Sequence, residues 1–89
     1  MTTQYFREVQ AKLSHCEDLI SSIKSLYEEM QDLQDAEYCE EELHIDETMA
    51  RLRFQTNKSM CISQIRTLTN YLESTMTNIN IASYDIEHQ

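Results

Sequence analysis

The chain has 89 residues and a formal net charge of −9, and it contains no glycine and no proline. Tight β-turns and sheet corners usually need one of these two residue types, so the composition argues against an all-β or α/β fold. No apolar run approaches the ~18 residues that would cross a bilayer, so we expect no membrane partner. We therefore expect one all-α domain over residues 1–89.

The first predicted element is a helix over about residues 3–34. Apolar residues alternate there in steps of three and four, which only an α-helix places on one face. In heptad terms, positions a and d are filled by Phe6, Val9, Leu13, Cys16, Ile20, Ile23, Tyr27 and Met30. Position g adds Leu19, Leu26 and Leu33, and three apolar columns are typical of a helix that touches more than one neighbour. We expect these three leucines to bind a partner.

The heptad phase is lost over about residues 35–45, which we expect to form an acidic connection. Asp46 is a suitable N-cap for a second helix over about 46–82, followed by a tail over 83–89. The stripe of this helix is Phe54, Lys58, Cys61, Ile65, Leu68, Leu72, Thr75, Ile79, Ala82 and Ile86. Met49 and Leu52 fall on nearly the opposite face, where we expect a separate partner-binding patch.

Two long helices with a short connection favour an antiparallel two-helix hairpin with coiled-coil-like packing, over one continuous helix. Such a hairpin buries little apolar surface relative to its ordering entropy. We therefore expect a bundle completed by a second copy, as a homodimer, or by another helical protein, as a heteromer.

The residues that carry chemistry predict no enzyme. Cys16 and Cys61 lie in helical stripes, where cysteine packs as a small hydrophobe, and we expect only Cys39 to be reachable. Cys39 and His44 lack the two further soft ligands of a zinc site. No catalytic motif is present, so we expect no catalytic residue, metal, cofactor or small-molecule substrate. The start of the chain does not resemble a signal peptide, and we expect a cytoplasmic protein.

Charge is segregated along the sequence. Residues 28–47 hold ten acids and no base, whereas residues 48–72 hold four bases and no acid. Charge runs usually form a solvated surface, but dense charge also steers association. We expect a docking surface for a basic partner at Glu37, Glu40, Glu41 and Glu42. Four dispersed bases are a poor match for phosphates, so no nucleic acid partner is expected.

The glycine- and proline-free pair of helices over residues 3–82 resembles the small co-chaperones of bacterial type III secretion. The resemblance covers architecture only and transfers no binding residue. It implies a short antiparallel hairpin that works bound to a second chaperone and a secreted needle subunit.

Together these features predict a non-enzymatic interaction module, such as a chaperone, adaptor or assembly subunit. The alternative is an acidic inhibitor that mimics nucleic acid charge and blocks a nucleic-acid-binding protein. A mimic needs acids spread along one face, whereas these are concentrated in twenty residues, which favours the interaction module.

Overall fold

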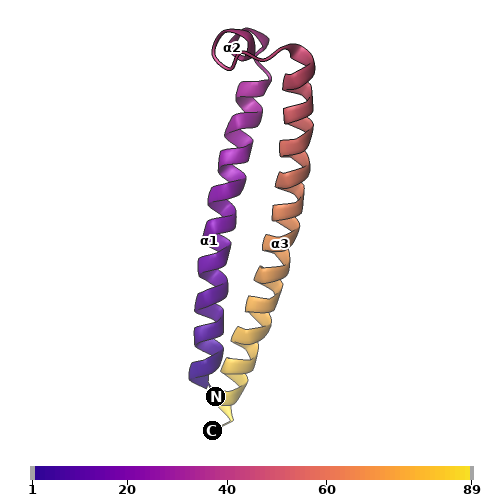
Figure 1. Ribbon diagram of the computed structural model, residues 1–89. Helices are drawn as coiled ribbons and strands as arrows, with labels where there is room; N and C mark the ends of the chain where they lie inside the picture. Colours follow the sequence, from indigo (N-terminus) through magenta and orange to yellow (C-terminus); the bar gives the residue numbers. More distant parts are fainter. Residues whose placement is uncertain (1, 89) are drawn as a thin grey trace.

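The computed structural model describes residues 2–88, and over this range the protein is all-α without a strand. The helices are α1 (Thr2–Leu33), α2 (Ala36–Glu41) and α3 (Glu47–Glu87). The long helices α1 and α3 lie side by side and run in opposite directions (Figure 1). The start of α1 and the end of α3 lie at one end of the molecule, here called the base, and α2 lies at the other end, here called the tip. The molecule measures 64 × 17 × 13 Å.

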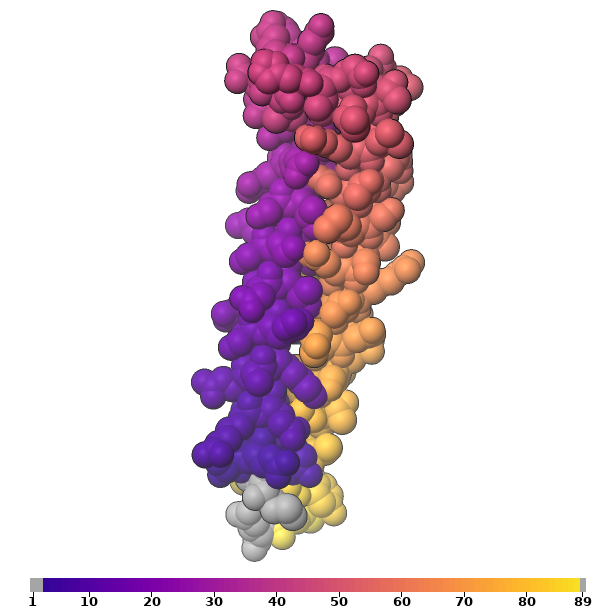
Figure 2. Space-filling model, viewed as in Figure 1, coloured from indigo at the N-terminus to yellow at the C-terminus, as the bar shows by residue number. Residues whose placement is uncertain are grey.

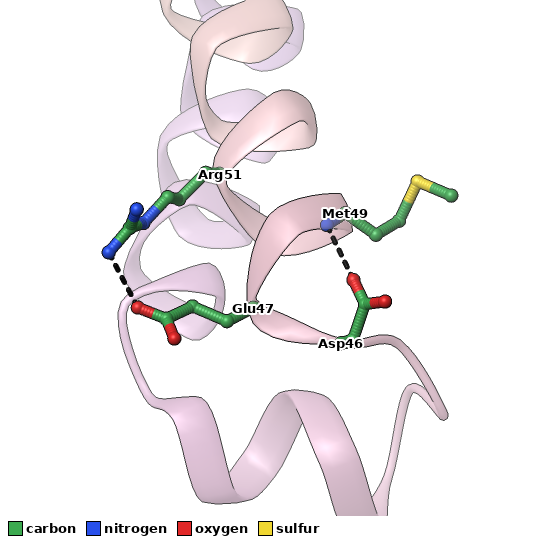
Figure 3. Close-up of polar contacts among 4 residues, drawn as sticks. All are labelled: Asp46, Glu47, Met49 and Arg51. Atoms are coloured by element: carbon green, nitrogen blue, oxygen red, sulfur yellow. Dashed lines mark hydrogen bonds and ion pairs between the residues drawn. The ribbon is translucent and has the colours of Figure 1, made fainter.

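An aspartate caps the N-terminus of each of the helices α2 and α3. The side chain of Asp35 accepts a hydrogen bond from the Tyr38 backbone N–H (3.1 Å) and so caps α2. Asp46 accepts from the Met49 backbone N–H (2.8 Å) and caps α3, as the sequence predicts (Figure 3). In the first turn of α3, Glu47 Oε1 pairs with Arg51 Nη2 at 2.6 Å. The two aspartate caps satisfy backbone amides that have no partner within their helices.

The structure settles two features that flank or extend the second long helix. The sequence leaves open whether residues 35–45 form a loop or a helix, and the structure contains a short helix there, α2. Helix α3 continues to Glu87, past the predicted end near residue 82 and through most of the predicted tail. Residues 1 and 89, at the limits of the predicted domain, lie outside the described range.

The turn between α2 and α3 passes through His44, whose φ of 55° lies in the left-handed region. Glycine enters this region without steric cost, but this chain has none. Histidine is among the few other residue types that are enriched there. His44 therefore takes the place that a glycine occupies in most such turns.

A small apolar cluster closes the tip. Its buried members are Leu33, Cys39 and Ala50, and Leu43, Ile45 and Phe54 pack against them. Cys39 is 1% exposed, and its Sγ lies 3.7 Å from the backbone carbonyl oxygens of both Asp32 and Leu33. The prediction that Cys39 is the reachable cysteine is therefore wrong, because α2 folds back over the end of α1 and turns this thiol inward.

Candidate functional site: an open apolar face on the helix pair

Helix α1 contacts α3 through its d and g columns. Over residues 3–33, every buried or partly buried side chain of α1 except Ser22 lies in these columns: Tyr5, Val9, Lys12, Cys16, Leu19, Ile23, Leu26, Met30 and Leu33. Leu33 is 6% exposed and belongs to the tip cluster, while Leu19 and Leu26 are partly buried. The predicted free surface at these three leucines is therefore corrected: this column faces α3.

The a column of α1 is the one left open. Phe6, Leu13, Ile20 and Tyr27 are 49%, 44%, 47% and 58% exposed. Sequence patterning found three apolar columns but assigned the wrong one to the outside, because periodicity alone does not show which pair of columns a neighbouring helix covers.

Helix α3 turns most of its large aliphatic side chains away from α1. Its buried residues are small or polar: Ala50, Asn57, Cys61, Thr75, Asn78 and Ala82. The half-exposed aliphatic residues on one flank of α3 are Ile62, Ile65, Leu72, Met76, Ile79 and Ile86. The single stripe predicted from the sequence is thus divided into two flanks. Cys61, Thr75 and Ala82 face α1, whereas Ile65 and Leu72 do not.

Cross-helix contacts show that the exposed residues of both helices share one side of the molecule. The contacts of Lys12 with Ser74, of Glu8 with Asn78 (3.4 Å) and of His15 with Tyr71 (ring centroids 4.6 Å) lie on the opposite flank. In an antiparallel pair, the remaining flank of each helix must then face the same way. We call this surface the open face: Phe6, Leu13, Ile20, Tyr27, Ile62, Ile65, Leu72, Met76, Ile79 and Ile86.

The opposite surface, here called the far face, is mostly polar. It is formed by Glu8, His15, Ser22, Glu29, Arg53, Met60, Thr67, Ser74 and Ile81. Only Met60 and Ile81 are large aliphatic residues there, at 44% and 37% exposed. The apolar surface of the helix pair is thus concentrated on one broad side.

The open face is regular along its length. The pairings His15–Tyr71 and Lys12–Ser74 fix the register, and both helices repeat every seven residues. Residues of the a column are therefore about level with residues of α3, in four pairs that we call rungs. The rungs are Phe6 with Ile79, Leu13 with Leu72, Ile20 with Ile65, and Tyr27 with Lys58.

At the tip, the open face leads into a pocket of about 380 Å³. Gln34 and Arg51 extend the two columns of rungs, and they line this pocket between the end of α1, α2 and the start of α3. The apolar part of its wall comes from the tip cluster, through Leu33, Cys39, Ala50 and Phe54, and from Ala36; Glu47 and Gln55 complete it. The Glu47–Arg51 ion pair and the Met49 side chain point to different sides of α3 (Figure 3).

The contact between α1 and α3 is partly polar. The Lys12 ammonium donates to Ser74 Oγ, and Asn78 Nδ2 donates to Glu8 Oε2. Asn57 Nδ2 and Gln64 Oε1 are buried with no hydrogen-bond partner in the described structure. Because unpartnered buried polar atoms cost free energy, this contact is a weak one for its length.

The other predicted site residues lie apart from the open face. Met49 and Leu52 are 47% and 60% exposed and fall on outer sides of α3. The predicted acidic docking residues are all exposed at the tip, with Glu37, Glu40 and Glu41 in α2 and Glu42 at its end. The structure places neither group beside the rungs, and both binding roles stay predictions.

Residues 2–88 contain no group of three or more His, Cys, Asp or Glu side chains placed to hold a metal ion. Within the same range, no helix is long and apolar enough to cross a membrane.

The space-filling view shows the two long helices in contact along their length, with the residues of the connection gathered at the tip (Figure 2).

The chain matches no protein-family model, and neither a curated protein nor a solved structure shows significant similarity to it.

Proposed function

We propose that this protein is a non-enzymatic interaction module, half of a helical bundle that a protein partner completes over the open face. The observation that carries the proposal is that the buried residues of α3 are small or polar, whereas four of its isoleucines and Leu72 are exposed on the open face. Large contiguous apolar patches on a small domain mark interaction sites. A role as a chaperone, adaptor or assembly subunit in the cytoplasm fits this surface.

The area of the open face supports the proposal. Ten large apolar side chains, each about half exposed, present on the order of 1,000 Å² on one chain, which compares with about 800 Å² per partner in a stable protein–protein interface. The α1–α3 contact, with its buried and unpartnered amide atoms, supplies less stabilisation than two helices of this length can provide. Covering the open face would supply the missing part of the core.

Two neighbouring isoleucines test the proposal. Ile20 lies on the open face at 47% exposed, whereas Ile23 is partly buried against α3. We expect Ile20→Asp to keep its helicity by circular dichroism and to lose association in sedimentation experiments. Ile23→Asp should unfold the domain, since it buries an unpaired charge. Met60→Asp on the far face is the matched control and should change neither property.

Crosslinking in the native host tests the same surface without assuming which partner binds. A photo-reactive residue at Leu72 should form protein adducts, and one at Met60 should not. If adducts at Leu72 are absent, or persist unchanged when Ile20→Asp is added, the open face is not the binding surface and the proposal is wrong. The class of partner that the type III secretion resemblance implies stays a prediction.

A further inference from the structure

We infer that the open face is covered by a second copy of this chain, packed tip to base, and that Ile86 of each copy enters the tip pocket of the other. This inference rests on the proposed function and names its partner. It follows from the spacing of the rungs, the charge of the tip and the length of α3.

The four rungs fit an identical set turned end over end. The two copies are related by a two-fold axis that lies between their open faces, perpendicular to the helices, and passes between the second and third rungs. This axis brings the four rungs of one copy over the four rungs of the other. Leu13 and Leu72 of one copy then come level with Ile20 and Ile65 of the other. Each α1 packs on the second α1 and each α3 on the second α3, all antiparallel, which gives a closed four-helix bundle.

The charge of the tip selects this orientation over the parallel one. Residues 28–47 carry ten acids and no base. A parallel dimer would place two such tips side by side, within the screening length of about 8 Å at physiological salt, where like charges repel. The tip-to-base dimer separates them along a molecule 64 Å long.

The same orientation brings opposite charges together along α3. The column of Ile65 and Leu72 begins with Arg51, which pairs with Glu47, and Lys58, whereas Asp85 and Glu87 lie near the end of α3. In an antiparallel pair of α3 helices, Arg51 and Lys58 of each one face the acidic end of the other. Arg51 of one copy would then lie close to the two acids that flank Ile86 of the other.

The length of α3 gives Ile86 its position. The register of His15 with Tyr71 and Lys12 with Ser74 sets Ala82 about level with the start of α1, so Ile86 extends beyond the first turn of α1. The end of α3 reaches past the start of α1 at the base (Figure 1). Ile86 is 54% exposed and belongs to the same column as Ile65, Leu72 and Ile79. Arg51 precedes Ile65 by two heptads and Ile86 follows Leu72 by two heptads. The two-fold axis therefore sets Ile86 against the pocket that Arg51 lines, whose volume is about 380 Å³ and whose wall includes Leu33, Ala50 and Phe54.

Sedimentation equilibrium of the full chain tests the partner. We expect a dimer of the 10.6 kDa chain. Ile86→Asp should raise the dimer dissociation constant by at least about tenfold, as expected for a residue that fills a pocket in an interface. Tyr84→Asp is the matched control: Tyr84 is 61% exposed but lies on another side of α3, and its change should have less than a threefold effect, about the scatter of a rim residue.

A distance measurement tests the orientation. A spin label at Glu41→Cys can be attached selectively, because native Cys16, Cys39 and Cys61 are buried. The tip-to-base dimer predicts a label separation above about 50 Å for helices of this length, and a parallel dimer predicts less than about 30 Å. A short distance, or equal effects of Ile86→Asp and Tyr84→Asp, overturns the arrangement.

A wild-type chain that stays a monomer overturns the second copy as partner. If Leu72 then crosslinks to an identified different protein in an Ile20-dependent manner, the proposed function still holds. If it crosslinks to nothing, both proposals fail. The two failures are therefore distinguishable.

Discussion

Asn57 and Gln64 lie two turns apart on the side of α3 that faces α1, and each buries a polar atom that has no hydrogen-bond partner. Together with Asn78, they make this column of α3 polar at a place where two packed helices usually contribute apolar side chains. Polar layers of this kind fix the register of coiled coils at a cost in stability.

We expect Asn57→Leu to raise the free energy of unfolding by about 1 to 2 kcal/mol, because it removes an unsatisfied amide and adds apolar contact. Urea unfolding followed by circular dichroism measures this change. Asn80→Leu, at an exposed position of α3, should stay within about 0.5 kcal/mol of wild type. A loss of stability in Asn57→Leu would mean that the Asn57 amide is hydrogen-bonded in solution.

Thiol reactivity tests the packing of the tip. Cys39 is 1% exposed, compared with 4% for Cys16 and 8% for Cys61. We expect all three to react with an alkylating reagent much more slowly in the native protein than in urea, with Cys39 no faster than the other two. A mass-spectrometric time course with site assignment measures this. Rapid and selective labelling of Cys39 would show that α2 does not stay packed on α1.

His44→Gly should stabilise the turn. Glycine removes the steric cost of a positive φ, which is about 1 to 2 kcal/mol for ordinary residues. It also loses more backbone entropy on folding, and this loss offsets part of the gain. The expected net gain is about 0.5 kcal/mol in thermal or urea unfolding. Glu42→Gly is the matched control: Glu42 has φ −96° and ψ −41°, so glycine there should destabilise the protein. The interpretation of the turn is contradicted if both substitutions shift stability in the same direction.

Neutralising the tip separates the two functions that the sequence suggests. Glu40, Glu41 and Glu42 are exposed, so changing all three to glutamine should alter stability by no more than about 0.5 kcal/mol. Association through the open face should survive with a smaller salt dependence. Under the acidic-inhibitor hypothesis, the same change would abolish binding to the target while helicity stays intact. Titration at two salt concentrations, with wild type as reference, distinguishes these results.

Heptad spacing and capping were sufficient to predict the two long helices and the start of the second. The run from Phe6 to Met30 fits only a helix, and Asp46 provides the N-cap that the structure contains. Whether residues 35–45 contain a helix was left open, since the six residues of α2, with several glutamates, carry too little periodicity to decide it. The extension of α3 to Glu87 was missed because Asn78, Asn80 and Ser83 are poor helix formers whose preferences the long helix overrides.

The sequence pattern could not predict which side of the helix pair forms the open face. The a, d and g columns of α1 are similarly apolar, and only the neighbouring helix decides which two are covered. In α3, the polar residues Asn57, Gln64 and Asn78 face inward, which reverses the usual expectation that apolar residues mark the contact. Cys39 was misplaced for a related reason: it lies in an acidic stretch of sequence, but one turn of α2 is enough to point it into the tip cluster.

The shared seven-residue repeat of α1 and α3 restricts how this protein can change in length. Removing one residue from α3 would turn everything beyond it by about 100°, and Ile79 and Ile86 would leave the open face. Removing seven residues from each long helix at matching levels would instead delete one rung and leave the surface continuous. Viable shorter or longer forms should therefore differ from this chain by whole, paired heptads, and a comparison of chain lengths would reveal the rungs without any structure.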